Sequence, residues 1–316
     1  MIAIFEQVLI LLIFSAAGFA LSKAKITKTE HANLLSGLLV YVFGPCLAFD
    51  NFSRKFNLAY LSDRYVLLIV ALALLALSYP MAALTAKLLT KKPYSRAVYH
   101  YILTVPNYGY IGYALCRALY GELGLLDMMI FALPMAVYAA SIGYSLLTSP
   151  GNGRVDFRRI FSPSLIATIL GAFVGLSGLK LPEVLTSITG QAAACMAPGS
   201  MILTGIVVAR YDIKKLLLQK KSYLISAVRL VGMPVLVYGL VKLASWVLSV
   251  SGLSGLGEAV TAMLPVIVLT YAMPCGMNTI VFPELVGEDC TIGASAVLIS
   301  TVAALITIPL CLTALL

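Results

Sequence analysis

Ten mostly apolar stretches, each long enough to cross a bilayer as a helix, follow one another along this chain of 316 residues. A hydrocarbon core of about 30 Å needs roughly 20 helical residues. A backbone in lipid must also satisfy its own hydrogen bonds, which an α-helix does. The sequence therefore predicts an all-α membrane protein with ten transmembrane helices, at residues 3–21, 30–49, 65–88, 97–120, 125–147, 160–178, 185–209, 223–250, 257–286 and 291–315.

The composition supports a single membrane domain. Apolar residues make up 61% of the chain, charged residues 11%, and the mean hydropathy is +0.99. Soluble domains are about 45–50% apolar, and no polar stretch here is long enough to fold alone. Six cysteines lie in or beside apolar runs without a Cys-x-x-Cys pair, so we expect no metal and no cofactor. The net charge of +9 comes from short loops and does not indicate a nucleic-acid partner.

The distribution of lysine and arginine predicts the orientation. The first, third, fifth and seventh connections between spans carry basic clusters and the ninth carries none, whereas the even-numbered ones carry only Arg54, Lys55, Arg64 and Lys180. Cytoplasmic loops are the ones enriched in basic residues. We therefore predict a multi-pass protein of the inner or plasma membrane with both termini outside the cytoplasm. The first stretch lacks a basic region and a cleavage site, which favours a retained span over a signal peptide.

A polar gap near residues 150–154 divides the chain into halves of five spans, residues 1–150 and 151–316. An odd number of spans per half means that the halves insert with opposite orientation. Homologous halves would then form a 5+5 inverted repeat. The positions of Gly44-Pro45 in the second span and Pro198-Gly199 in the seventh agree with this correspondence.

The fourth and ninth spans, which correspond in the two halves, are both interrupted by proline, glycine and asparagine. The fourth contains Val105-Pro106-Asn107-Tyr108-Gly109, and the ninth contains Met273-Pro274-Cys275-Gly276-Met277-Asn278. Each run then ends in Gly-Glu, at 121–122 and 287–288. Proline removes a backbone donor and clashes with the preceding turn. Paired interruptions of this kind mark the midplane binding site of secondary transporters.

Two broken helices that meet would bring two helix N-termini together, and such termini bind anions. We expect Pro106 and Pro274 to break the helices. We also expect an anion to be bound by Asn107, Tyr108, Gly109, Cys275, Gly276, Asn278 and Thr279. We expect Arg229 to be the charge partner of the anion, because a guanidinium donates to carboxylates in a fork. No acidic residue lies at the centre of a span, and His100 is a candidate for proton coupling.

The order and spacing of these motifs resemble the auxin efflux carrier family, which includes bacterial malate and malonate permeases and plant auxin exporters. The matching elements are residues 106–113 with Ala118-Leu119-Tyr120-Gly121, Ala272-Met273-Pro274 with Asn278, and the tail from Leu298 to Leu310. The likeness covers essentially the whole chain. The tyrosines at 108 and 110 depart from the smaller residues usual in bacterial members, which leaves the substrate open.

The resemblance implies the fold of bile-acid sodium symporters, with two broken crossing helices at spans four and nine. Spans 1, 2, 6 and 7 would form a scaffold, and spans 3–5 and 8–10 a transport domain that moves by an elevator mechanism. It also implies a proton- or potential-driven carrier and a homodimer through scaffold helices.

We therefore expect a secondary transporter of small organic anions, either mono- or dicarboxylates such as malate or malonate, or auxin-like acids. A sodium-coupled organic anion symporter on the same fold is the alternative. An enzyme is not expected, because the chain contains no His-Glu-x-x-His or Gly-x-Ser-x-Gly motif.

Overall fold

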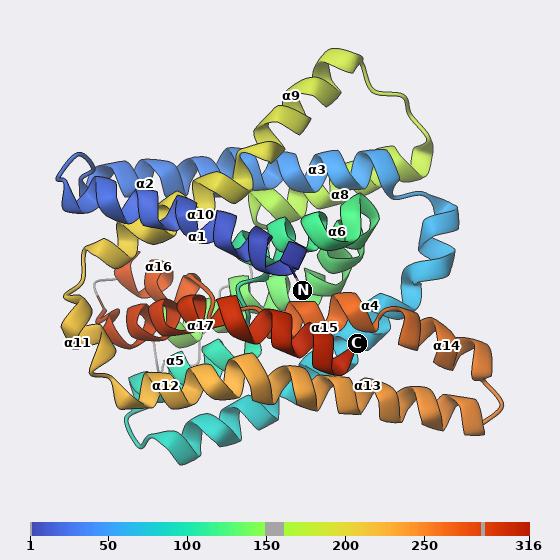
Figure 1. The fold of residues 1–316 in the computed structure, drawn as a ribbon. Helices are drawn as coiled ribbons and strands as arrows, with labels where there is room; N and C mark the ends of the chain where they lie inside the picture. Colours follow the sequence, from blue (N-terminus) through green and yellow to red (C-terminus); the bar gives the residue numbers. More distant parts are fainter. Residues whose placement is uncertain (1, 149–160, 286–287) are drawn as a thin grey trace.

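The computed structural model describes residues 2–148, 161–285 and 288–316, and every regular element in these ranges is helical (Figure 1). The prediction of an all-α protein is confirmed for these residues. The predicted division of the chain at residues 150 and 151 falls outside them. The loop residues Arg154, Arg158 and Arg159 also lie outside them.

The elements before this gap include the first interrupted span. They are α1 (Ile2–Lys23), α2 (Thr29–Leu38), η1 (Leu39–Phe43), α3 (Gly44–Lys55), α4 (Leu58–Leu89), α5 (Pro93–Thr104), η2 (Tyr108–Gly112), α6 (Tyr113–Tyr138), η3 (Ala139–Gly143) and α7 (Tyr144–Thr148). The η elements are π-helical turns that continue into the neighbouring α-helices.

The elements after the gap include the second interrupted span. They are α8 (Pro163–Ser177), α9 (Glu183–Ala194), α10 (Met196–Ala209), α11 (Ile213–Leu217), α12 (Lys220–Ala227), η5 (Val228–Gly232), α13 (Met233–Val250), α14 (Ser254–Ala262), α15 (Leu264–Ala272), α16 (Asn278–Leu285) and α17 (Thr291–Leu315).

Six described helical runs are long and apolar enough to cross a membrane, and α14 with α15, bent by 43°, make a seventh. These helices make the chain a multi-pass membrane protein. The number is below the predicted ten because several segments are short or interrupted. Helix α8 has 15 residues and α5 has 12. The run Tyr108–Thr148 spans 41 residues but is broken at Gly121, whose φ is 69°.

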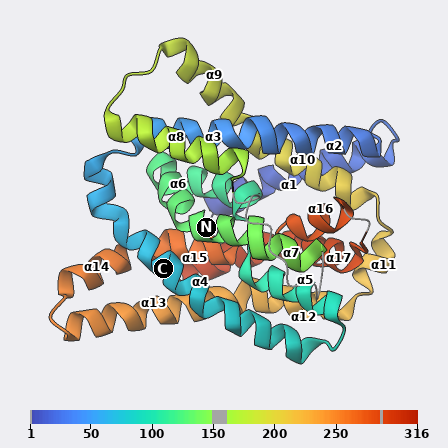
Figure 2. The same ribbon diagram turned by 180° about the vertical axis from the view of Figure 1, so that it is seen from behind.

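The helices form two layers with α6 between them (Figures 1 and 2). The α3 layer consists of α1, α2, α3, α8, α9 and α10, in which α1 packs along α10 and α3 packs along α8. The α13 layer consists of α4, α5, α12, α13, α15 and α17. Helix α6 contacts α3 in the first layer and both α4 and α15 in the second.

Two glycines allow the close approach of α1 and α10. A Cβ atom on Gly205 of α10 would lie 1.8 Å from the carbonyl oxygen of Ser15, and one on Gly18 of α1 would lie 2.1 Å from that of Ile202. These positions therefore accept no larger side chain without separating the helices.

Replacing Gly205 with alanine is expected to destabilise the protein by about 1–3 kcal/mol, the usual cost of overpacking. The matched control is Gly37→Ala on α2, where a Cβ would meet nothing within 4 Å. Because alanine favours the helical state, the control should keep or slightly raise stability. Thermal unfolding of the purified variants in detergent measures both effects. Equal midpoints for the two variants would contradict the close α1–α10 contact.

Candidate transport site

The fourth and ninth predicted spans are each interrupted where a proline follows an extended residue. Helix α5 ends at Thr104, and Val105 then adopts φ −117° and ψ 105°. Helix α15 ends at Ala272, and Met273 adopts φ −65° and ψ 145°. The residue before a proline is excluded from the helical region by steric clash, which explains both ends.

The two interruptions cross and pair through their backbones. Pro106 and Cys275 form an isolated antiparallel bridge. The N–H of Asn107 donates to the carbonyl of Pro274 at 2.9 Å. A Cβ on Gly276 would lie 3.3 Å from the carbonyl oxygen of Val105, so a glycine suits this close approach. The structure thus brings together the two motifs that the sequence singled out.

Arg229 of η5 holds the helix ends behind this crossing. Its side chain is fully buried, and its three nitrogens donate to the carbonyls of Leu103 at 2.8 Å, Tyr271 at 3.0 Å and Met273 at 3.2 Å. Carbonyls in the last turn of a helix have no partner within the helix and carry its negative dipole end. Arg229 therefore joins the C-terminal ends of α5 and α15. It does not lie in the wall of the cavity next to the crossing.

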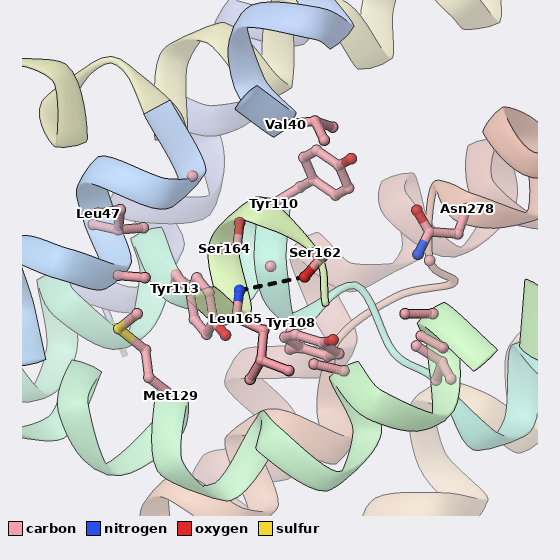
Figure 3. A pocket seen from close by; sticks show the side chains of 18 of the residues that line it. Val40, Leu47, Tyr108, Tyr110, Tyr113, Met129, Ser162, Ser164, Leu165 and Asn278 are labelled. Atoms are coloured by element: carbon pink, nitrogen blue, oxygen red, sulfur yellow. Dashed lines mark hydrogen bonds between the residues drawn. The ribbon is translucent and has the colours of Figure 1, made fainter. Parts of the chain in front are cut away.

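A cavity of about 240 Å³ lies on the other side of the crossing. Helices α6 and α16 form part of its wall, and the α3 layer forms another part. Six of the predicted site residues line it: Pro106, Asn107, Tyr108, Gly109, Gly276 and Asn278. Figure 3 shows Tyr108, Tyr110, Tyr113 and Asn278 around this space, with Leu47 of α3 and Ser164 of α8 contributing to the wall. Gly109 leaves the cavity open, because a Cβ there would meet nothing within 4 Å.

Asn107 has an unusual environment. Its side chain is 1% exposed, yet neither its Oδ1 nor its Nδ2 has a hydrogen-bond partner. A buried polar group without a partner costs about 1–3 kcal/mol. A side-chain amide in this state keeps both a donor and an acceptor available for a bound molecule that reaches it.

Three other predicted site residues, Asn278, Thr279 and Cys275, have partners that fix them. The Nδ2 atom of Asn278 donates to the hydroxyl of Tyr101 at 2.9 Å. The hydroxyl of Thr279 donates to the carbonyl of Gly276 at 2.8 Å, and the N–H of Cys275 donates to Ser300 of α17 at 3.0 Å. Cys275 and Thr279 are buried and lie outside the cavity wall, so they support the crossing.

The described wall of this cavity contains no charged side chain. Its polar residues include Asn107, Asn278, Tyr108 and Ser164. Two helix N-termini, at Tyr108 and at Asn278, also border it, and the N-terminal end of a helix favours a negative group. At α16 the N–H groups of Thr279 and Ile280 already donate to the carbonyls of Gly276 and Met277. Within the described ranges, no three His, Cys, Asp or Glu side chains are grouped as metal ligands.

Sequence reasoning missed the part of the wall that α3 and α8 provide. The cavity is lined there by Leu39 of η1 and Leu47 of α3, and at α8 by Ser162, Ser164 and Thr168. Ser162 caps α8 by accepting a hydrogen bond from the N–H of Leu165 at 3.3 Å, drawn as a dashed line in Figure 3. A serine before Pro163 is a recognisable helix start, but nothing in that motif indicates a cavity.

Comparison with known proteins agrees with this geometry. Residues 3–157 and 152–312 match the family described as membrane transport protein. The chain belongs to that family. It is the auxin efflux carrier family that the motifs resembled, so this prediction is confirmed. A similar protein is an uncharacterized transporter from Methanothermobacter thermautotrophicus, 26% identical over 310 residues that cover 96% of each chain. Family and relative together make this membrane transport protein a transporter and give no support for an enzyme.

Proposed function

We propose that this membrane transport protein is a secondary transporter of small organic anions, either mono- or dicarboxylates such as malate or malonate, or auxin-like acids. The observation that carries the proposal is Asn107. This residue lines a cavity at the crossing of two broken helices, and its buried side-chain amide has no hydrogen-bond partner. Transporters place their substrate at such crossings, where helix N-termini point at anionic groups.

The proposal counts each interrupted helix as a span and so has ten spans in a 5+5 inverted repeat. Helix α5 with η2 and α6 as far as Gly121 is the fourth span, and the rest of α6 with α7 is the fifth. Helices α14, α15 and α16 form the ninth. The protein would lie in the inner or plasma membrane. Both of its termini would then face away from the cytoplasm.

In this proposal the α3 layer is the scaffold, and the remaining helices form the transport domain. The close packing of α1 on α10 and of α3 on α8 supports a rigid scaffold. The cavity has walls from both parts, so a movement of one part past the other would carry the bound anion across the bilayer. The same scaffold helices would form the contact of a homodimer.

Among the proposed acids, the cavity favours a small one with a single negative charge. Its volume of about 240 Å³ lies just below the roughly 300–1,000 Å³ typical of small-molecule pockets. Because its described wall contains no cationic side chain, helix N-termini and amides must stabilise the negative charge. One carboxylate suits this arrangement better than two. Transport would be driven by a proton gradient or by the membrane potential.

Uptake by proteoliposomes tests the proposal. Labelled malate, malonate, succinate and indole-3-acetate are supplied with and without a pH gradient and a membrane potential, in sodium and in choline. We expect saturable uptake of at least one acid that depends on the proton gradient or the voltage and persists in choline. Uptake that requires sodium would establish the symporter alternative. A folded protein that takes up none of the four acids would contradict the carboxylate assignment.

A further inference from the structure

A second, smaller cavity of about 50 Å³ adjoins the first. Leu47, Gly109, Tyr110, Tyr113 and Met196 line both cavities. Residues that border both spaces stand between them, so Tyr110 and Tyr113 form the aromatic part of the partition. The two cavities therefore lie in series along the interface between α6 and the α3 layer.

Arg117 of α6 lines the second cavity, and it is the one charged side chain in the described walls of the two cavities. Its Nε and a terminal guanidinium nitrogen both bond to the same carboxylate oxygen of Glu122. The Arg117 and Glu122 side chains are 41% and 35% exposed, so water and dissolved ions reach the pair. A guanidinium in this position suits carboxylates.

The chain turns sharply between the two partners of this ion pair. Gly121 adopts φ 69°, which only glycine enters at little cost, and this turn returns Glu122 toward Arg117. The second carboxylate oxygen of Glu122 lies 3.9 Å from Nζ of Lys55 on α3. The Gly-Glu sequence at the end of the broken span thus places the carboxylate of Glu122 on Arg117. The same carboxylate lies near Lys55 of the α3 layer.

We propose that Arg117 is a second carboxylate-binding subsite, in series with the main cavity and occupied in this conformation by Glu122. An arriving organic anion displaces Glu122 from Arg117, and the released Glu122 remains beside Lys55. This exchange binds anions next to the first cavity, whose described wall contains no cationic side chain. This inference rests on the proposed function, since it assigns a residue of the same path to carboxylate recognition.

Half-saturation concentrations for malonate and indole-3-acetate test the subsite in Arg117→Gln, Glu122→Gln and the control Lys180→Gln. Loss of a charge-assisted hydrogen bond should raise the half-saturation about tenfold in Arg117→Gln. Removal of the competing carboxylate should lower it about threefold in Glu122→Gln. The control removes one exposed positive charge outside both cavity walls and should stay close to wild type. In the Arg117→Gln background, Glu122→Gln should have no further effect.

The subsite faces one side of the membrane, so intact cells and inside-out vesicles should differ. The Arg117→Gln effect is expected in one preparation and not in the other. Unchanged half-saturation in both, or a raised value in Glu122→Gln, would overturn the subsite while leaving the carboxylate transporter in place.

If the wild type takes up no acid, the proposed function fails and the subsite is tested by binding alone. Malonate should then raise the unfolding midpoint of Glu122→Gln more than that of Arg117→Gln. Equal midpoint shifts in the two variants would overturn the subsite.

Discussion

Replacing Asn107 with alanine is expected to reduce uptake of the transported acid to the background of empty liposomes while leaving the protein folded. The side chain makes no hydrogen bond within the protein, so its removal deprives no neighbour of a partner. Removing a buried amide without a partner is close to neutral for stability. A hydrogen bond to a charged ligand contributes about 1.5–3 kcal/mol, which corresponds to roughly 10–100-fold in binding.

The measurement combines initial uptake rates with the thermal midpoint of the same preparation. Asn51→Ala is the matched control, because Asn51 is also a buried asparagine but lies on α3 outside the cavity wall. Its Nδ2 donates to the carbonyl of Leu47 at 2.9 Å, so this variant should lose stability and keep its half-saturation. Transport at the wild-type rate by Asn107→Ala would remove Asn107 from the site.

The crossing could be predicted from sequence because its cause is local. Pro106 and Pro274 each break a helix whatever surrounds them, and in lipid the freed backbone groups must find partners in the protein. The structure supplies those partners mutually, through the N–H of Asn107 and the carbonyl of Pro274. The symmetric position of the two motifs in the chain indicated that they meet.

The division of roles among neighbouring residues could not be predicted in the same way. Cys275 and Thr279 each lie next to a cavity-lining residue yet are buried outside the wall. The backbone before α16 is irregular and has no period from which the sequence could give the direction of a side chain. The contributions of Leu47 and Ser164 depend on how the α3 layer packs against α6, which no local motif encodes.

Arg229 shows the same limit for a charged residue. Sequence reasoning marks an arginine within a membrane span as functional and expects it to be paired. The expected partner is an anion, because carbonyl groups at helix ends have no sequence signature that would indicate them as partners. The structure provides three such carbonyls from two different helices. The expectation that Arg229 contacts the substrate's carboxylate therefore competes with a role in holding the crossing.

Replacing Arg229 with lysine or glutamine separates these two roles, and we expect a large loss of stability in both variants. A guanidinium reaches the carbonyls of Leu103, Tyr271 and Met273 at once. The single ammonium of lysine is a point charge without this planar fork. Each buried carbonyl left without a donor costs about 1–3 kcal/mol. The loss should therefore reach about 3 kcal/mol or more, and uptake should fall because fewer molecules keep the crossing intact.

Thermal midpoints and half-saturation concentrations of the same preparations decide the question. Lys242→Gln on α13 is the control, because Lys242 is exposed and its ammonium lies 5.8 Å from the ring centre of Tyr238. This variant should keep both quantities. If Arg229 holds the crossing, the midpoint of Arg229→Lys falls, and the molecules that remain folded bind substrate with near-normal half-saturation. An unchanged midpoint with a strongly raised half-saturation would instead assign Arg229 to the substrate, since only a direct charge contact weakens binding without loosening the helix ends.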